Sequence, residues 1–173
     1  LIIIPIVFFF IIKGSLFFLF FLGIFFYATS YEWFKMNKDD GFKIIGIIYL
    51  FIVVYSAYYL RENFGLEVFI FIIIICIFTD IGGYIFGKLF KGPKLIKISP
   101  NKTYAGMIGG FILSIIFVNM FFNMTYLFPN KPEISLDIFL FVMLISSISQ
   151  LGDMIISFFK RMSKIKDTGK IIP

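Results

Sequence analysis

The chain has 173 residues, of which 60% are Ala, Val, Ile, Leu, Met, Phe, Trp, Tyr or Cys and only 15% are charged. An average soluble domain is about 45–50% apolar with Gly included and about 25% charged, so an ordinary soluble domain, a disordered chain and a secreted disulfide scaffold are excluded. The single cysteine excludes an intrachain disulfide, and the lack of histidine in this chain excludes His-based acid–base catalysis and His metal ligands. The bilayer is therefore the expected solvent.

Charged and turn residues divide the sequence into apolar spans. In chain order, these cover 1–12, 15–34, 44–60, 66–87, 104–122 and 136–159. A membrane-crossing helix needs about 20 residues, and a buried strand only about 4–8. We therefore predict an all-α polytopic membrane protein with about six transmembrane helices in a single integral-membrane domain, 1–173. The first span is too short to cross; since the chain starts at Leu1 and stops at Pro173, we expect it to be truncated at both ends.

The basic residues are distributed unevenly between the connectors. Alternation of the spans puts 13 of the 16 Lys and Arg residues on one side, in 35–43, 88–103 and 160–173. The other three, Lys13, Arg61 and Lys131, fall on the opposite side. Positively charged loops stay in the cytoplasm. We therefore expect a multi-pass protein of the bacterial inner membrane, or an equivalent membrane, with its basic loops and its active site at the cytoplasmic boundary.

Two acids stand near the ends of long apolar spans, Asp80 and Asp153. An Asp at the centre of a membrane helix costs about 2.5–3.5 kcal/mol, so such residues usually have a function. The alternative is that each one pairs with a nearby lysine or reaches the interface. Both spans end on the basic side, and we therefore expect the two carboxylates to approach each other and the 88–103 loop.

Small residues follow the first of these acids. Gly83 and Gly87 are four positions apart, and Gly106, Gly109 and Gly110 open the next span. Small residues at such spacings allow membrane helices to approach closely, so close helix packing is the favoured interpretation of Gly83 and Gly87. For Gly106, Gly109 and Gly110, packing is an equal alternative to a role in an anion site at the start of the span.

The loop before the fifth span combines turn residues with cations. Pro100 and Asn101 mark a turn, and Thr103 is suited to cap the next helix. A helix N-terminus flanked by Lys102 and Ser99 is a candidate anion site. Simple anchoring of the basic loop to acidic lipid is the alternative.

The end of the last span combines an acid with cations. Asp153, Ser157, Lys160 and Arg161 share a broad helical face, with the acid deeper and the cations toward water. An acid that can hold a divalent cation beside cations that can hold phosphate is typical of phosphoryl chemistry on a lipid headgroup. A basic juxtamembrane helix end without chemistry is the alternative.

Together, these segments resemble the membrane-bound phosphatidate cytidylyltransferases, also called CDP-diacylglycerol synthases. The resemblance runs through Asp80-Ile-Gly-Gly-Tyr-Ile-Phe-Gly-Lys, Ser99-Pro-Asn-Lys-Thr-Tyr-Ala-Gly, Leu151-Gly-Asp and the stretch from Ser157 to Pro173. The family pattern continues into Gly-His-Gly-Gly and Asp-Arg-x-Asp motifs, which this chain does not contain. Because that second motif supplies metal carboxylates in the family, we expect the 173-residue chain to be inactive alone.

The resemblance implies that CTP and phosphatidic acid give CDP-diacylglycerol and pyrophosphate, with Mg²⁺ as cofactor and a second cation left open. It implies a metal ligand at Asp153. Catalytic roles fall on Asp80, Lys102, Lys160 and Asp167. Substrate contacts fall on Lys88, Ser99, Thr103, Ser157, Arg161 and Lys166. The expected partners are CTP, phosphatidic acid and the bilayer, without nucleic acid, and a homodimer is left open.

Two other functions are compatible with parts of the pattern. A CTP-dependent polyprenol or dolichol kinase would share the basic loops and intramembrane acids, but it would release CDP rather than pyrophosphate. A cation transporter or channel would use Asp80 and Asp153 for ion passage, but it gives no reason for the clustered basic loops beside them.

Overall fold

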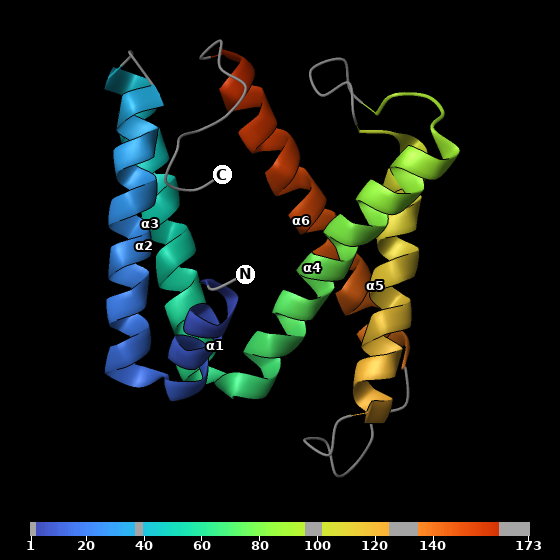
Figure 1. The fold of residues 1–173 in the computed structure, drawn as a ribbon, viewed down its shortest axis with the longest axis horizontal. Helices are drawn as coiled ribbons and strands as arrows, with labels where there is room; N and C mark the ends of the chain where they lie inside the picture. Colours follow the sequence, from blue (N-terminus) through green and yellow to red (C-terminus); the bar gives the residue numbers. More distant parts are fainter. Residues whose placement is uncertain (1–2, 37–39, 96–101, 125–134, 163–173) are drawn as a thin grey trace. The chain divides into compact units, whose positions relative to one another are not determined.

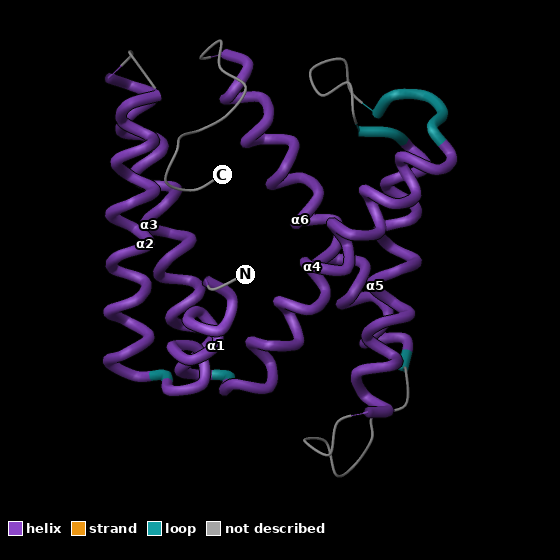
Figure 2. The backbone as a smooth tube through the Cα atoms, in the orientation of Figure 1, coloured by secondary structure: helices purple, strands orange, loops and turns teal. Residues whose placement is uncertain are grey.

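A computed structural model describes residues 3–36, 40–95, 102–124 and 135–162. In these ranges the chain forms helices and one isolated β-bridge, and no strand (Figure 2). The helices, labelled in Figure 1, are α1 (Ile3–Lys13), α2 (Ser15–Met36), α3 (Asp40–Asn63), α4 (Gly65–Phe90), α5 (Tyr104–Met124) and α6 (Leu136–Met162). Helices α2 to α6 are long and apolar enough to cross a membrane, and α1, with 11 residues, is too short. The predicted all-α membrane fold is confirmed.

Every helix lies within four residues of its predicted span at both ends. The largest difference is at the start of α3, which begins at Asp40 rather than at 44. Asp40 lies in the first turn, where a negative charge is favoured by the helix dipole, and its carboxylate accepts from Lys43 at 2.6 Å. The prediction counted apolar residues only, whereas the helix continues into charged ones.

The chain divides into two compact units. The first comprises 1–69 and 160–173, and the second comprises 70–159. A single membrane domain over 1–173 stays a prediction.

In the first unit, the end of α3 caps two other helices at once. The α1–α2 junction turns through Gly14 and Ser15, which have φ of 63° and 49°. The Arg61 guanidinium donates to the carbonyls of residues 11 and 12 near the C-terminus of α1, at 2.9 and 3.3 Å. The Glu62 carboxylate accepts from the backbone N–H of Ser15, at the start of α2, at 2.8 Å. The Arg61 cation thus complements the negative end of the α1 dipole, and the Glu62 anion complements the positive end of the α2 dipole. Both also satisfy backbone groups that have no partner within their own helix.

The α2–α3 contact is built on one tryptophan. The Trp33 ring lies against Gly46, where any β-carbon would collide with it. Its indole N–H donates to the Phe42 carbonyl at 3.1 Å. Buried Trp side chains usually find such a partner for their polar atom. Trp33 therefore packs α2 against α3.

The second unit has a core made by three helices. Ile75 of α4, Val118 and Phe122 of α5 and Val142 of α6 are buried together. Phe71 stacks on Phe122 with ring centroids 5.1 Å apart. This core joins α5 to α4, which carries Asp80, and to α6, which carries Asp153.

Glycines bring α4 and α5 into close contact. A β-carbon added at Gly106 would lie 2.7 Å from the Gly83 carbonyl oxygen and 3.4 Å from the Gly87 Cα. A β-carbon at Gly110 would lie 2.9 Å from the Thr79 carbonyl oxygen. Real side chains do not tolerate the shorter of these separations, so the close backbone approach requires glycine. The predicted packing role of these glycines is confirmed.

Candidate active site

The segment between α4 and α5 is shaped by backbone geometry. After α4 ends at Phe90, Lys91 and Gly92 take φ of 50° and 93°, the left-handed conformation that commonly terminates helices. The chain then pairs with itself, since the Leu95 N–H donates to the Lys102 carbonyl at 2.8 Å. A bridge between Lys94 and Thr103 lies beside this bond. These contacts fix the backbone of Lys102 at the entrance to α5.

Thr103 caps α5, as the sequence predicted. Its hydroxyl oxygen accepts from the Gly106 N–H at 3.1 Å, and its carbonyl accepts from the Met107 N–H at 3.0 Å. A side-chain oxygen bonded to the third N–H of a helix is the usual N-cap geometry. The positive end of the α5 dipole therefore lies next to the backbone of Lys102.

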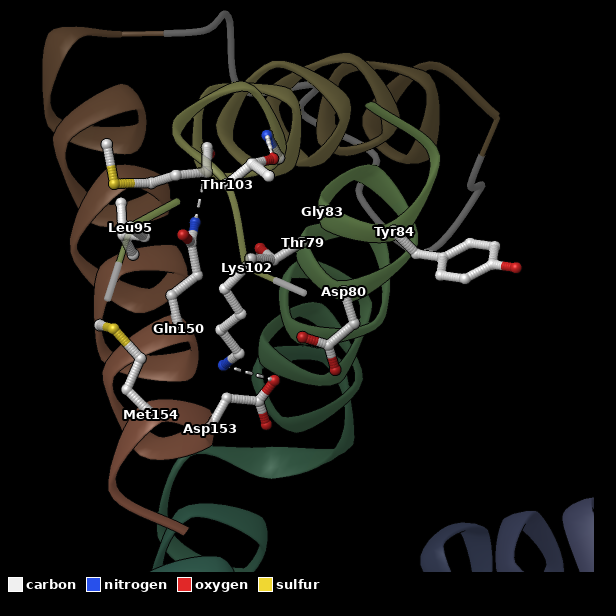
Figure 3. A pocket seen from close by; sticks show the side chains of 12 residues that line it. Thr79, Asp80, Gly83, Tyr84, Leu95, Lys102, Thr103, Gln150, Asp153 and Met154 are labelled. Atoms are coloured by element: carbon white, nitrogen blue, oxygen red, sulfur yellow. Dashed lines mark hydrogen bonds and ion pairs between the residues drawn. The ribbon is translucent and has the colours of Figure 1, made fainter. Parts of the chain in front are cut away.

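A pocket of about 220 Å³ opens between α4, α6 and the start of α5 (Figure 3). Its walls combine charged, polar and apolar side chains. The lining residues are Thr79, Asp80, Gly83, Tyr84, Leu95, Lys102, Thr103, Gly106, Met107, Gln150, Asp153 and Met154.

Both intramembrane acids lie at this pocket. The Lys102 ammonium lies 3.2 Å from an Asp153 carboxylate oxygen, and the Asp80 carboxylate faces the same pocket (Figure 3). The structure thus brings Asp80, Asp153 and Lys102 of the 88–103 loop to one pocket, as predicted. Asp80 was expected to have a catalytic role or to pair with a nearby lysine, and here Lys102 pairs with Asp153.

The ion pair is partly open to solvent. The side chains of Lys102 and Asp153 are 26% and 60% exposed. Such pairs contribute about 0–1 kcal/mol to stability. A ligand can therefore replace either partner with little loss of folding stability. This is typical of a binding site and not of a pair that stabilises the fold.

Beneath the charges lie polar contacts that the sequence reasoning missed. The buried hydroxyls of Thr79 and Ser146 are 2.8 Å apart and join α4 to α6. The Gln150 amide donates to the Met107 carbonyl at 3.4 Å and joins α6 to α5. Their presence inside apolar spans indicated that these polar residues need partners in other helices. Which partners they find depends on how the helices are rotated, and this cannot be read from the sequence.

Other predicted residues stand outside this pocket or outside the described structure. The Lys88 ammonium lies 3.4 Å from the Tyr84 hydroxyl and 5.6 Å from the ring centroid of the same residue, and Lys88 does not line the pocket. Ser157 is half-buried on α6 and does not line it either. Lys160 and Arg161, in the last turn of α6, belong to the first unit, so their part in the site stays a prediction. Ser99, Lys166 and Asp167 lie outside the described residues.

The donor set suits a hard cation. Within the described ranges, no cluster of three or more His, Cys, Asp or Glu residues is present, and the pocket offers the carboxylates of Asp80 and Asp153. Mg²⁺ is usually bound by one or two carboxylates, with waters and substrate phosphates completing its octahedron. The two acids therefore fit Mg²⁺ bound together with a phosphorylated substrate.

Comparison with known proteins assigns the family. The profile of the cytidylyltransferase family matches residues 39–173, which include all of α4, α5, α6 and the pocket. The chain belongs to the cytidylyltransferase family. It is similar to proteins named phosphatidate cytidylyltransferase from three staphylococci: 34% identical over 158 residues for Staphylococcus haemolyticus, 36% over 156 for Staphylococcus saprophyticus and 34% over 154 for Staphylococcus aureus.

Each of these alignments covers 86% of this chain and 57% of the relative. The chain thus spans little more than half the length of the curated relatives that it matches. No solved structure matches it.

Proposed function

We propose that the protein transfers the cytidylyl group of CTP to phosphatidic acid, giving CDP-diacylglycerol and pyrophosphate. The observation that carries this proposal is the meeting of two carboxylates, one ammonium and a capped helix N-terminus in one pocket. The names of the similar staphylococcal proteins support the same reaction. The 220 Å³ pocket is smaller than the roughly 300–1,000 Å³ of a complete small-molecule site, so it would hold the phosphate end of the substrates.

The chemistry needs little from a general base. A lipid phosphate oxygen, already ionised near neutral pH, attacks the α-phosphorus of CTP. A new P–O bond forms, the bond to the β-phosphate bridging oxygen breaks, and pyrophosphate leaves with its electron pair. The main barrier is repulsion between anions, which positioned cations and dipoles lower.

The charged residues of the pocket then have defined roles. The Lys102 ammonium leaves Asp153 and binds a phosphate, next to the positive end of the α5 dipole that Thr103 caps. Asp80 and Asp153 would hold Mg²⁺, which when bound neutralises and orients the phosphates. Substrate contacts from Lys88, Ser157, Lys160 and Arg161 belong to the same proposal, with the basic loops and the site on the cytoplasmic side of the membrane.

The test is a product assay on the full-length protein in detergent micelles. Radiolabelled CTP, phosphatidic acid and Mg²⁺ should give labelled CDP-diacylglycerol and pyrophosphate. Formation of a phosphorylated lipid together with CDP would instead establish a lipid kinase, and cation flux in liposomes without CTP would establish a transporter. Either result would overturn the proposal.

A matched pair of lysine variants tests the site. Lys102→Met should lower kcat/KM on the order of 10²–10³-fold, because a positioned donor to transition-state charge is lost. Lys94→Met is the control, since Lys94 pairs with Thr103 through its backbone, is exposed and does not line the pocket. Equal activity of the two variants would count against a role for Lys102.

A further inference from the structure

One face of α6 contacts three different parts of the second unit through polar side chains. The face is made by Ser146, Gln150 and Asp153, spaced by four and three residues. Ser146 bonds to Thr79 of α4, Gln150 bonds to the Met107 carbonyl of α5, and Asp153 bonds to Lys102. Of these contacts, only the one between Thr79 and Ser146 is fully buried, with exposures of 1% and 0%.

The buried contact is fully satisfied. The Thr79 oxygen lies 2.7 Å from the Ile75 carbonyl and 2.8 Å from the Ser146 oxygen. Since a hydroxyl carries a single proton, both contacts are met when Ser146 donates to Thr79 and Thr79 donates to Ile75. Both side chains are almost completely buried, so the bond holds α4 and α6 in one register.

The bond lies deeper in the apolar spans of α4 and α6 than the two acids do. Thr79 immediately precedes Asp80, and Ser146 lies two turns before Asp153 on the same face of α6. The surrounding core of Ile75 and Val142 is apolar, and such contacts have no preferred direction. A hydrogen bond does have one, with a narrow range of length and angle.

We infer that the Thr79–Ser146 hydrogen bond is a positioning element that sets the Asp80 carboxylate against the Asp153 carboxylate. The inference rests on the proposed function, because the spacing of the two acids matters for holding a cation and phosphates. A misplacement of about 1 Å can cost on the order of 10²-fold in rate. The Thr79 side chain also lines the pocket, but its hydroxyl is bonded to Ile75 and Ser146, so Thr79 and Ser146 act through the acids.

Variants that remove one hydroxyl test this role. Thr79→Val keeps the shape of the side chain and loses the hydroxyl, and Ser146→Ala removes the partner. Each should lower kcat roughly 10- to 100-fold with a smaller change in KM for CTP, and the double variant should be no worse than either single one. Thr79→Ser, which keeps the hydroxyl, should restore activity.

The matched control is Ser114→Ala. Ser114 is also fully buried, but its hydroxyl donates to the Phe111 carbonyl 2.9 Å away in its own helix, α5. The kcat of the Ser114→Ala variant should therefore stay near that of the wild type. Additive losses in the double variant, or losses that merely follow the amount of folded protein, would overturn the inference.

A second readout does not depend on turnover. In a Cys76→Ala background, spin labels at Ile77→Cys on α4 and Ile148→Cys on α6 report the distance between these helices, since both positions are exposed. Thr79→Val and Ser146→Ala should shift or broaden the distance distribution, and Ser114→Ala should not. Unchanged distributions would overturn the inference. If the wild type made no CDP-diacylglycerol, the proposed function would fall, whereas the spin-label distances would still decide the positioning.

Discussion

Asp153 is the residue on which the proposed chemistry depends most. Its carboxylate meets Lys102 at 3.2 Å, yet 60% of the side chain stays exposed and open to a ligand. Asn is nearly isosteric but lacks the charge that a hard cation requires. In the full-length protein, Asp153→Asn should therefore lower the rate of CDP-diacylglycerol synthesis on the order of 10²–10³-fold at saturating Mg²⁺.

The same substitution should leave folding and insertion intact. The exposed pair contributes at most about 1 kcal/mol, so thermal unfolding in detergent should change little. Asp137→Asn is the control, because Asp137 is an exposed acid in the first turn of the same helix. Undiminished synthesis by Asp153→Asn would count against a metal role for this carboxylate.

At the scale of helices, the close contact of α4 and α5 depends on the missing side chain of Gly106. A β-carbon there would lie 2.7 Å from the Gly83 carbonyl oxygen, so Gly106→Ala must push the helices apart. We expect a loss of about 1–3 kcal/mol of stability, as for other overpacked sites. Gly152→Ala on α6 meets nothing within 4 Å and should be neutral or stabilising. Thermal unfolding of both variants in detergent is the measurement, and equal stabilities would contradict the packing role.

The α1–α2 junction gives a second prediction about helices. Glu62 accepts from the Ser15 N–H at the start of α2, so Glu62→Ala should cost about 0.5–2 kcal/mol, the usual effect of a lost N-cap. Glu62→Gln keeps an oxygen acceptor and should lose less. Denaturant or thermal unfolding compares the two. An equal loss for the two variants would show that the charge of Glu62, and not its hydrogen bond to Ser15, stabilises the junction.

The helices were predictable because the length of an apolar span and the charges at its ends determine where a membrane helix runs. The Thr103 cap was predictable as well, since capping is local in sequence. The partners of Thr79, Arg61 and Lys88 were not, because each depends on which face of one helix meets another. The meeting of Asp80 with Asp153 was predictable only because both spans end on the same side and both acids lie near those ends.

At the scale of the whole molecule, the region that matches the family contains every residue that lines the pocket. The match over residues 39–173 leaves out α1 and α2, and the pocket lies within 79–154. Arg61 and Glu62, which lie in the matched region, nevertheless hold the α1–α2 junction. The first two helices are thus joined to the family region by specific polar contacts and not only by apolar packing.

The uneven distribution of basic residues predicts which side of the membrane the pocket faces. Since 13 of the 16 Lys and Arg residues lie on the side of the 88–103 loop, that loop and Lys102 should be cytoplasmic, where CTP is available. In a Cys76→Ala background, an exposed residue on each side can be replaced by cysteine: Phe64→Cys between α3 and α4, and Lys91→Cys after α4. In intact spheroplasts, a membrane-impermeant maleimide should label Phe64→Cys and should label Lys91→Cys only after lysis. The Cys76→Ala protein without a new cysteine should stay unlabelled in both conditions. The opposite labelling would place the pocket away from the cytoplasmic nucleotide pool, and CTP could then not be the substrate.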